Sequence, residues 1–252
     1  MSFGALTSSG FGYTYVPAVS QYSGGVVAED GHRLERYRFA QAVPLASAFD
    51  GIRELLGGRS LPVTALCAME LRSPEPVSDA GFAAFNTRYR TFLDDWAITA
   101  SGDNPVARSN VCPDVAPPET NTVHAFCIAV PGASGGSRDF VVSGSAETPE
   151  GGSYEGGALE AGQADAEAME RKAQWVTGEM ERRMALLGVS WAEASAIQVY
   201  TVREFHRSVE ASLRPAVATG TPLSWFYCRP PVVGLEFEMD VRRVTTEHLL
   251  PE

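Results

Sequence analysis

The stretch GLEFEMDV, residues Gly234–Val241, alternates strictly between apolar and acidic side chains. An alternation with a period of two predicts a β-strand with one buried face. The other face carries Glu236, Glu238 and Asp240, with neighbours roughly 7 Å apart along the strand. This face is either an exposed acidic edge or the wall of a cleft in which one carboxylate acts as an acid or base. The stretch alone leaves both interpretations open.

The length and composition are those of an ordinary globular protein. A chain of 252 residues, 44% hydrophobic and 20% charged, can form one large domain or two of common size. Its net charge of −11 argues against a nucleic-acid partner, because phosphate binding depends on Lys and Arg. We find no apolar run long enough to span a membrane and no secretory signal, so we expect a cytoplasmic protein.

Metal or cofactor chemistry finds little support in the sequence. The four Cys lack CxxC spacing, which predicts reduced thiols rather than disulfides. The four His are scattered without ligand spacing, so we expect no metal site. The GASGG segment at 132–136 fits a G-x-S-x-G pattern, but a strand follows it where a nucleophile elbow would need a helix. No phosphate-binding Gly loop is present, and we expect no cofactor.

Hydrophobic periodicity and turn residues divide the chain into regular elements. Residues 1–40 read as short strands and turns. Helices are predicted at residues 44–56, 79–96, 163–187 and 205–213. Strands are predicted at residues 63–71, 106–111, 122–130, 140–144, 196–202, 223–228 and 235–244.

The order of these elements repeats. A Gly- and Ser-rich linker at 131–138 separates residues 1–130 from residues 139–252, and both halves read strands, helix, strand, helix, strand, strand. This order predicts an internal duplication. Each half would be an α+β unit, a mixed β-sheet with two helices on one face. The uncovered faces must then pack against each other or against another subunit.

Short motifs in both halves resemble segments of the RidA/YjgF superfamily, which has a chorismate mutase-like fold. Each motif is short, but they occur in the family's order and cover most of both halves. The matching segments are Phe82–Tyr89 (FAAFNTRY), Pro105–Ser109 (PVARS), Phe140–Gly144 (FVVSG), Leu187–Trp191 (LGVSW), Val199–Val202 (VYTV) and Glu236–Asp240 (EFEMD).

The resemblance implies an activity and a set of site residues. Family members are typically trimers with clefts between subunits, and they hydrolyse reactive enamines and imines to keto acids and ammonia. By resemblance, Arg108 matches the arginine that binds the substrate carboxylate, and Asn86 matches the helix asparagine. Glu238 is the first match to the acid of the last strand and Glu236 the second.

Each half departs from the family pattern at a different place. The second half has Leu223-Ser224 where Ala-Arg-Ser would stand, and the first half has Val123–Phe126 where Glu-Ile-Glu would stand. Neither half holds a complete site, but the two are complementary. We therefore expect one composite cleft, with Arg108 and Asn86 from the first half and Ser143, Gly144 and Glu238 from the second.

A second resemblance concerns the segment Tyr227–Glu236, which is similar to the closing segment of chorismatases. That family also pairs a degenerate half with a functional one. The resemblance would make Cys228 part of the cleft wall, although a free Cys is commonly just a buried residue.

These observations lead to one preferred function. We expect a cofactor-free hydrolytic deaminase or tautomerase acting on a small carboxylate that bears an enamine or imine, either aminomuconate-like or biosynthetic. The alternatives are a chorismatase-like lyase or hydrolase that releases pyruvate, and a non-catalytic ligand-binding or assembly protein. We expect a homo-oligomer, with a trimer favoured. The sequence leaves open the substrate, the acting acid among Glu236, Glu238 and Asp240, and whether one chain or two form the cleft.

Overall fold

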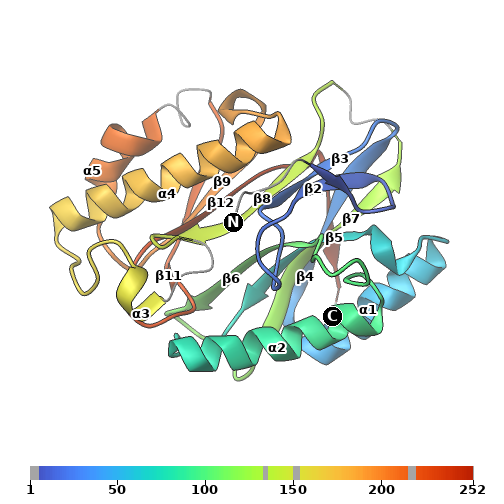
Figure 1. Ribbon diagram of the computed structural model, residues 1–252, viewed down its shortest axis with the longest axis horizontal. Helices are drawn as coiled ribbons and strands as arrows, with labels where there is room; N and C mark the ends of the chain where they lie inside the picture. Colours follow the sequence, from blue (N-terminus) through green and yellow to red (C-terminus); the bar gives the residue numbers. More distant parts are fainter. Residues whose placement is uncertain (1–5, 133–135, 150–153, 215–219, 252) are drawn as a thin grey trace.

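The computed structural model describes residues 6–132, 136–149, 154–214 and 220–251 (Figure 1). Two β-sheets lie face to face in the middle, and the helices cover their outer faces. Three residues of the predicted linker, 133–135, fall outside the described ranges. The layer between the sheets contains a cluster of buried apolar residues, including Tyr13, Tyr15, Val26, Leu34, Cys67, Ala68, Ala107 and Cys127.

The first sheet has six strands in the order β11-β6-β5-β7-β4-β13. Helices α1 (Leu45–Gly58) and α2 (Asp79–Asp95) pack on it through the apolar faces that their periodicity predicted. A 3-10 turn, Val63–Ala65, occupies the start of the predicted strand 63–71. The strands are β4 (His32–Pro44), β5 (Leu66–Arg72), β6 (Ala107–Pro113), β7 (Thr122–Pro131), β11 (Cys228–Arg229) and β13 (Thr246–Leu250).

The second sheet has seven strands in the order β1-β2-β3-β8-β12-β9-β10. The long helix α4 (Ala166–Leu187) covers it, and its stripe from Met169 to Leu187 is buried as expected. The predicted helix 205–213 is a short α5 (His206–Ser208) continued by a π-helical turn, and α3 is Tyr154–Gly157. The strands are β1 (Thr7–Ser8), β2 (Tyr13–Val16), β3 (Gly25–Ala28), β8 (Phe140–Ala146), β9 (Ala196–Tyr200), β10 (Leu223–Phe226) and β12 (Glu238–Arg243).

The two sheets share a strand order. In the first, β4-β7-β5-β6 are neighbours; in the second, β8-β12-β9-β10 are neighbours. In both, the first two pairings are antiparallel and the third is parallel. The mixed α+β class is confirmed, and the strand order fits the predicted duplication. The relation of the halves to the RidA fold and the domain boundaries stay predictions.

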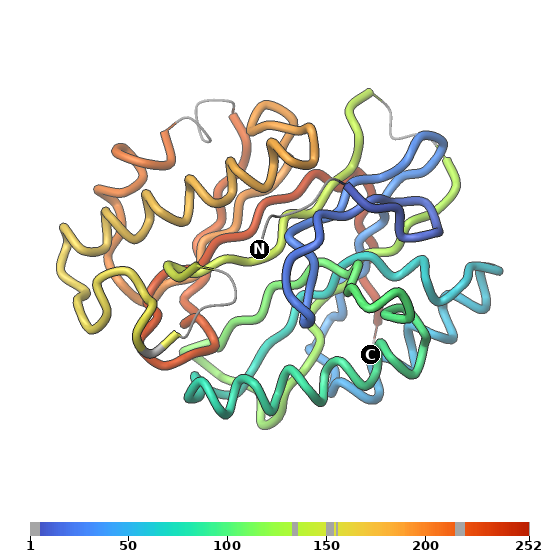
Figure 2. Tube along the Cα trace, in the orientation of Figure 1, coloured from blue at the N-terminus to red at the C-terminus, as the bar shows by residue number. Residues whose placement is uncertain are grey.

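The ends of the chain are exchanged between the sheets. The early strand β3 pairs with β8 of the second sheet, and the late strand β13 pairs with β4 of the first. In Figure 2, β3 is blue chain beside the yellow-green β8, and β13 is red chain beside the blue β4. Each sheet is therefore completed by a segment from the other half. No described helix is long and apolar enough to cross a membrane.

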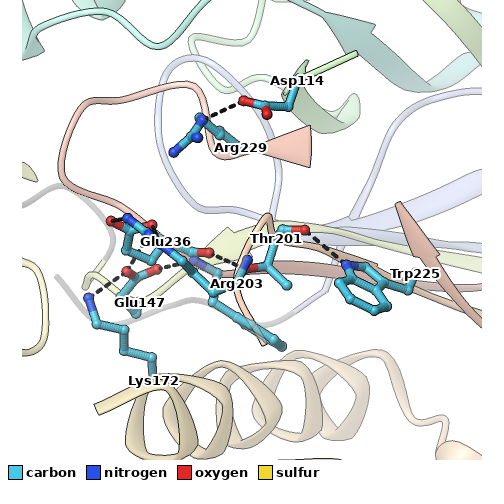
Figure 3. Close-up of polar contacts among 9 residues, drawn as sticks. Asp114, Glu147, Lys172, Thr201, Arg203, Trp225, Arg229 and Glu236 are labelled. Atoms are coloured by element: carbon cyan, nitrogen blue, oxygen red, sulfur yellow. Dashed lines mark hydrogen bonds and ion pairs between the residues drawn. The ribbon is translucent and has the colours of Figure 1, made fainter. Parts of the chain in front are cut away.

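A buried ion pair holds the chain segment that leads into β12. Lys172 Nζ on α4 lies 3.0 Å from Glu147 Oε1, and both side chains are fully buried. The Glu147 carboxylate also accepts hydrogen bonds from the backbone N–H groups of Glu236 (2.7 Å) and Phe237 (3.0 Å), as Figure 3 shows for Lys172 and Glu236. Glu147 thus holds residues that were predicted to be strand, and the strand itself begins at Glu238.

We expect Lys172→Met to lower the free energy of unfolding by about 3–5 kcal/mol, because it leaves the buried Glu147 carboxylate without its cation. Urea denaturation measures this. The matched control is Arg171→Met, which breaks the exposed pair with Glu160 on the same helix and should cost about 1 kcal/mol or less. Equal losses in the two variants would contradict a special role for the buried pair.

Candidate active site

A cavity opens beside β6, where the two halves of the chain meet. It holds about 480 Å³ of space not filled by protein atoms, part of it open to solvent. Its walls come from β6, α2, the end of β8, the start of α3 and the segment before β12. The polar residues that line it are Tyr22, Arg108, Asn110, Ser145, Thr148, Tyr154 and Glu238, and the others include Phe82, Gly144, Pro231, Val232 and Leu235.

The incompletely paired edge of β6 explains why residues of the second half come here. Strand β11 pairs only with the end of β6, at Cys112 and Pro113. Further back, the Arg108 N–H donates to Ser143 Oγ at 3.0 Å, and the Asn110 N–H is near enough to the Glu238 carboxyl group to lower its pKa. A side chain of the second half therefore satisfies a backbone donor that a neighbouring strand would otherwise satisfy.

Arg108 is buried, with 4% of its surface exposed, inside a cage of aromatic rings. Its Cζ lies 5.0 Å from the ring centroids of Tyr22 and Tyr89, and 5.7 Å from those of Phe82 and Phe85. Its Nη1 has no hydrogen-bond partner, and burial lowers the pKa of the guanidinium. A desolvated guanidinium with an unused donor is suited to an anion, above all to a carboxylate.

Glu238 is the acid of the cavity. Burial and, next, the negative charge of Asp240 raise the pKa of Glu238 to about 8, against the opposing effects of Arg108 and the Asn110 N–H. Its carboxyl group is therefore protonated at neutral pH and can donate a proton. The acidic face of the opening stretch is not an exposed edge, since Glu238 and Asp240 are both 5% exposed.

Gly144 makes room for this carboxyl group. A Cβ on Gly144 would lie 2.3 Å from Glu238 Oε1 and 3.1 Å from the Cβ of Ser109. Only a residue without a side chain lets Glu238 reach the edge of β6. Behind it, Ser143 Oγ donates to the backbone carbonyl of Ser23 at 2.5 Å and so supports Arg108 without lining the cavity.

The other two acids of the strand have different surroundings. Asp240 accepts a hydrogen bond from the Tyr200 hydroxyl at 2.8 Å, and burial raises its pKa to about 6. It lies between the sheets rather than in the cavity. Glu236 pairs with Arg203 at 2.9 and 3.1 Å (Figure 3) and does not line the cavity.

Asn86 and Cys228 also lie outside the cavity. Asn86 is a buried residue of α2, but it lines a separate surface hollow together with Gln21 and Arg90. Cys228 packs against Val111 and Tyr200, and burial raises the pKa of its thiol. The structure thus brings together Arg108, Gly144 and Glu238, with Ser143 in support, and it does so within one chain.

Sequence reasoning missed several lining residues. Asn110 had a usable signal, because it follows Arg108 by two positions on the same face of a predicted strand. Tyr22 and Thr148 lie in irregular segments and Tyr154 begins the four-residue helix α3, so no periodicity marks a shared face. Within the described parts of the chain, no group of three His, Cys, Asp or Glu residues could hold a metal ion.

A buried arginine and a protonated carboxyl group in one cavity can bind a small carboxylate and exchange a proton with it. The model of the family described as 2-aminomuconate deaminase CnbZ matches residues 5–248, and the chain belongs to that family. A 2-amino-5-chloromuconate deaminase from Comamonas testosteroni is 41% identical over 248 residues, covering 98% of this chain and 99% of that protein.

Solved structures give weaker likenesses. A chorismatase has a TM-score of 0.46 at 12% identity, over 92% of this chain and 77% of the other. A cyanuric acid hydrolase from A. caulinodans has a TM-score of 0.43 at 12% identity, over 86% and 69%. Both are too distant to support a conclusion about activity. Membership of the RidA/YjgF superfamily, the trimer and the cytoplasmic location stay predictions.

We expect Gly144→Ala to lower kcat by about tenfold or more, because the new Cβ must displace the Glu238 carboxyl group from its position. Steady-state ammonia release from 2-aminomuconate measures this. Gly51→Ala is the matched control, since a Cβ there meets open space on α1 and should leave turnover unchanged. Full activity in Gly144→Ala would show that catalysis does not require the Glu238 carboxyl group at the position it has in this structure.

The raised pKa of Glu238 also predicts a pH dependence of stability. From its ordinary pKa of 4.5 up to about 8, the native state holds a proton that the unfolded chain has released. The free energy of unfolding should therefore fall as the pH rises through this window, by up to about 1.4 kcal/mol per pH unit.

The variant that tests this is Glu238→Gln, which carries no titrating group at this position. Urea denaturation at about pH 5 and about pH 8 should show it gaining stability relative to the wild type as the pH rises. Asp240 remains in both proteins, so the comparison reports on the carboxyl group of residue 238 together with its interaction with Asp240. Parallel curves would mean that Glu238 is ionised in the native state at neutral pH.

Proposed function

We propose that the protein is a cofactor-independent hydrolytic deaminase of small unsaturated carboxylates bearing an enamine or imine, such as 2-aminomuconate. One observation carries the proposal: an arginine with an unused donor and a protonated carboxyl group share a cavity. Membership of the deaminase family and the 41% identical deaminase support the same reaction.

Arg108 binds the substrate carboxylate in this scheme. Its unpaired Nη1 belongs to the planar donor fork that fits two carboxylate oxygens. The rings of Tyr22 and Phe82, which also line the cavity, supply flat apolar surfaces for a conjugated chain. The carbon that bears nitrogen, next to the bound carboxylate, would then lie near Glu238.

Glu238 moves the protons. Its carboxyl group protonates the enamine carbon and becomes a carboxylate, while the enamine becomes an iminium ion. The carboxylate then takes a proton from a water molecule that attacks the iminium carbon, which gives a carbinolamine. The hydroxyl proton of the carbinolamine moves to its nitrogen, the C–N bond breaks, the carbonyl forms and ammonia leaves. The balance is substrate plus water giving a 2-oxo acid and ammonia, with Glu238 reprotonated. Without the water step, the same proton transfer would be a tautomerisation.

We expect Arg108→Met to lower kcat/KM for 2-aminomuconate by roughly 100-fold, because the variant loses the charged hydrogen bonds to the carboxylate. The same variant should unfold at an equal or higher urea concentration, since Met replaces a buried and incompletely paired cation. This combination separates a binding role from a structural one. Ammonia release above the spontaneous rate and urea denaturation are the two measurements.

The outcome also distinguishes the alternatives. Arg108→Lys keeps the charge without the planar fork, and it should recover only a small part of the activity. Pyruvate released from chorismate, with no ammonia from 2-aminomuconate, would favour the lyase. Ligand binding that Arg108→Met abolishes, without turnover by the wild type, would favour a binding protein.

A further inference from the structure

We propose that Asn110 and Thr148 form a neutral binding site for the distal carboxylate of a dicarboxylate substrate, in the same cavity as Arg108, which binds the other carboxylate. This inference rests on the proposed function, because that function places one substrate carboxylate at Arg108 and so sets the direction in which the substrate lies. It assigns a specificity role to two residues that the catalytic scheme does not use. Both line the cavity, and both are more than nine-tenths buried.

Asn110 presents an unused donor in a fixed orientation. Its side chain is 4% exposed, and its Oδ1 accepts a hydrogen bond from Ser73 Oγ at 3.0 Å. This bond leaves the Nδ2 amide, which is buried without a partner. A buried amide donor without a partner costs free energy unless a ligand supplies an acceptor.

Thr148 supplies a second hydroxyl in the same cavity. It is 6% exposed, its Oγ1 has no hydrogen-bond partner, and its backbone N–H is already bonded to the Ala146 carbonyl at 2.7 Å. The turn that this bond closes holds the residue just beyond the end of β8. Only the side-chain hydroxyl of Thr148 is therefore available to a ligand oxygen.

The spacing suits the two ends of one molecule. Arg108 and Asn110 occupy the same face of β6, so their Cα atoms are roughly 7 Å apart, which leaves room for the two side chains to contact different groups of one ligand. Arg108 is the only basic side chain among the described residues that line the cavity. A second carboxylate must therefore rely on neutral donors, and Asn110 and Thr148 have the unused ones.

Muconate and sorbate test the site without turnover. They share a conjugated diene and one carboxylate, but sorbate has a methyl group where muconate has its second carboxylate. Calorimetry should show wild-type protein binding muconate about tenfold more tightly than sorbate, the ratio expected for hydrogen bonds to a charged group. Asn110→Asp should abolish or reverse this preference, because its carboxylate repels the distal one, and should change sorbate affinity about twofold or less.

Two further variants guard against misfolding and simple charge effects. Thr148→Val keeps the shape of the side chain and should lose part of the preference for muconate. Asn121→Asp makes the same charge change at a residue outside the cavity and should bind both ligands like the wild type. Equal binding of the two ligands by the wild type, or equal losses for both in Asn110→Asp and Thr148→Val, would overturn the inference.

Ammonia release from 2-aminomuconate, measured on the same proteins, reports separately on the proposed function. A muconate preference that disappears in Asn110→Asp supports the site even if no variant releases ammonia, and the proposed reaction alone then fails. Ammonia release by the wild type without a muconate preference leaves the reaction standing and removes the roles of Asn110 and Thr148.

Discussion

The incompletely paired edge of β6 is the constraint on which the rest of the structure depends. Buried backbone N–H groups need acceptors, and β11 is too short to supply them along the whole strand. Ser143, from the second half of the chain, accepts from the Arg108 N–H, and Glu238 of the same half lies near the Asn110 N–H. The contacts that join the two halves therefore also place a carboxyl group in the cavity with Arg108, so the fold and the site depend on the same contacts.

The electrostatics of the cavity follow from burial rather than from a simple ion pair. Arg108 lowers the pKa of Glu238, but desolvation and Asp240 act in the opposite direction and prevail. If Glu238 were ionised, it would compete for the guanidinium that a substrate needs. A neutral Glu238 leaves the Arg108 cation available to bind the substrate and keeps a proton for the reaction. The aromatic rings stabilise the Arg108 cation, and the apolar walls favour the neutral form of Glu238.

Local patterns in the sequence predicted much of the fold, and two residues of the proposed reaction, Arg108 and Glu238. Helical and strand periodicity is a property of neighbouring residues, so α2, α4 and most strands were found close to their true bounds. The separate roles of Glu236 and Glu238 were not predictable, because they depend on residues that are distant in the sequence. Arg203 pairs with the Glu236 side chain. Glu147, itself paired with Lys172, accepts from the Glu236 backbone N–H. The exchanged strands β3 and β13 involve pairing across the chain, which no short pattern records.

The exchange of β3 and β13 has a consequence for how the chain acquires its shape during synthesis. The first sheet gains its outer strand β13 from the second half, while β3 of the first half can pair with β8 only after the second half has been made. Neither sheet is complete until residues of the second half have been synthesised. Because Glu238 belongs to that half, the cavity also forms late, and a nascent first half carries open sheet edges until then.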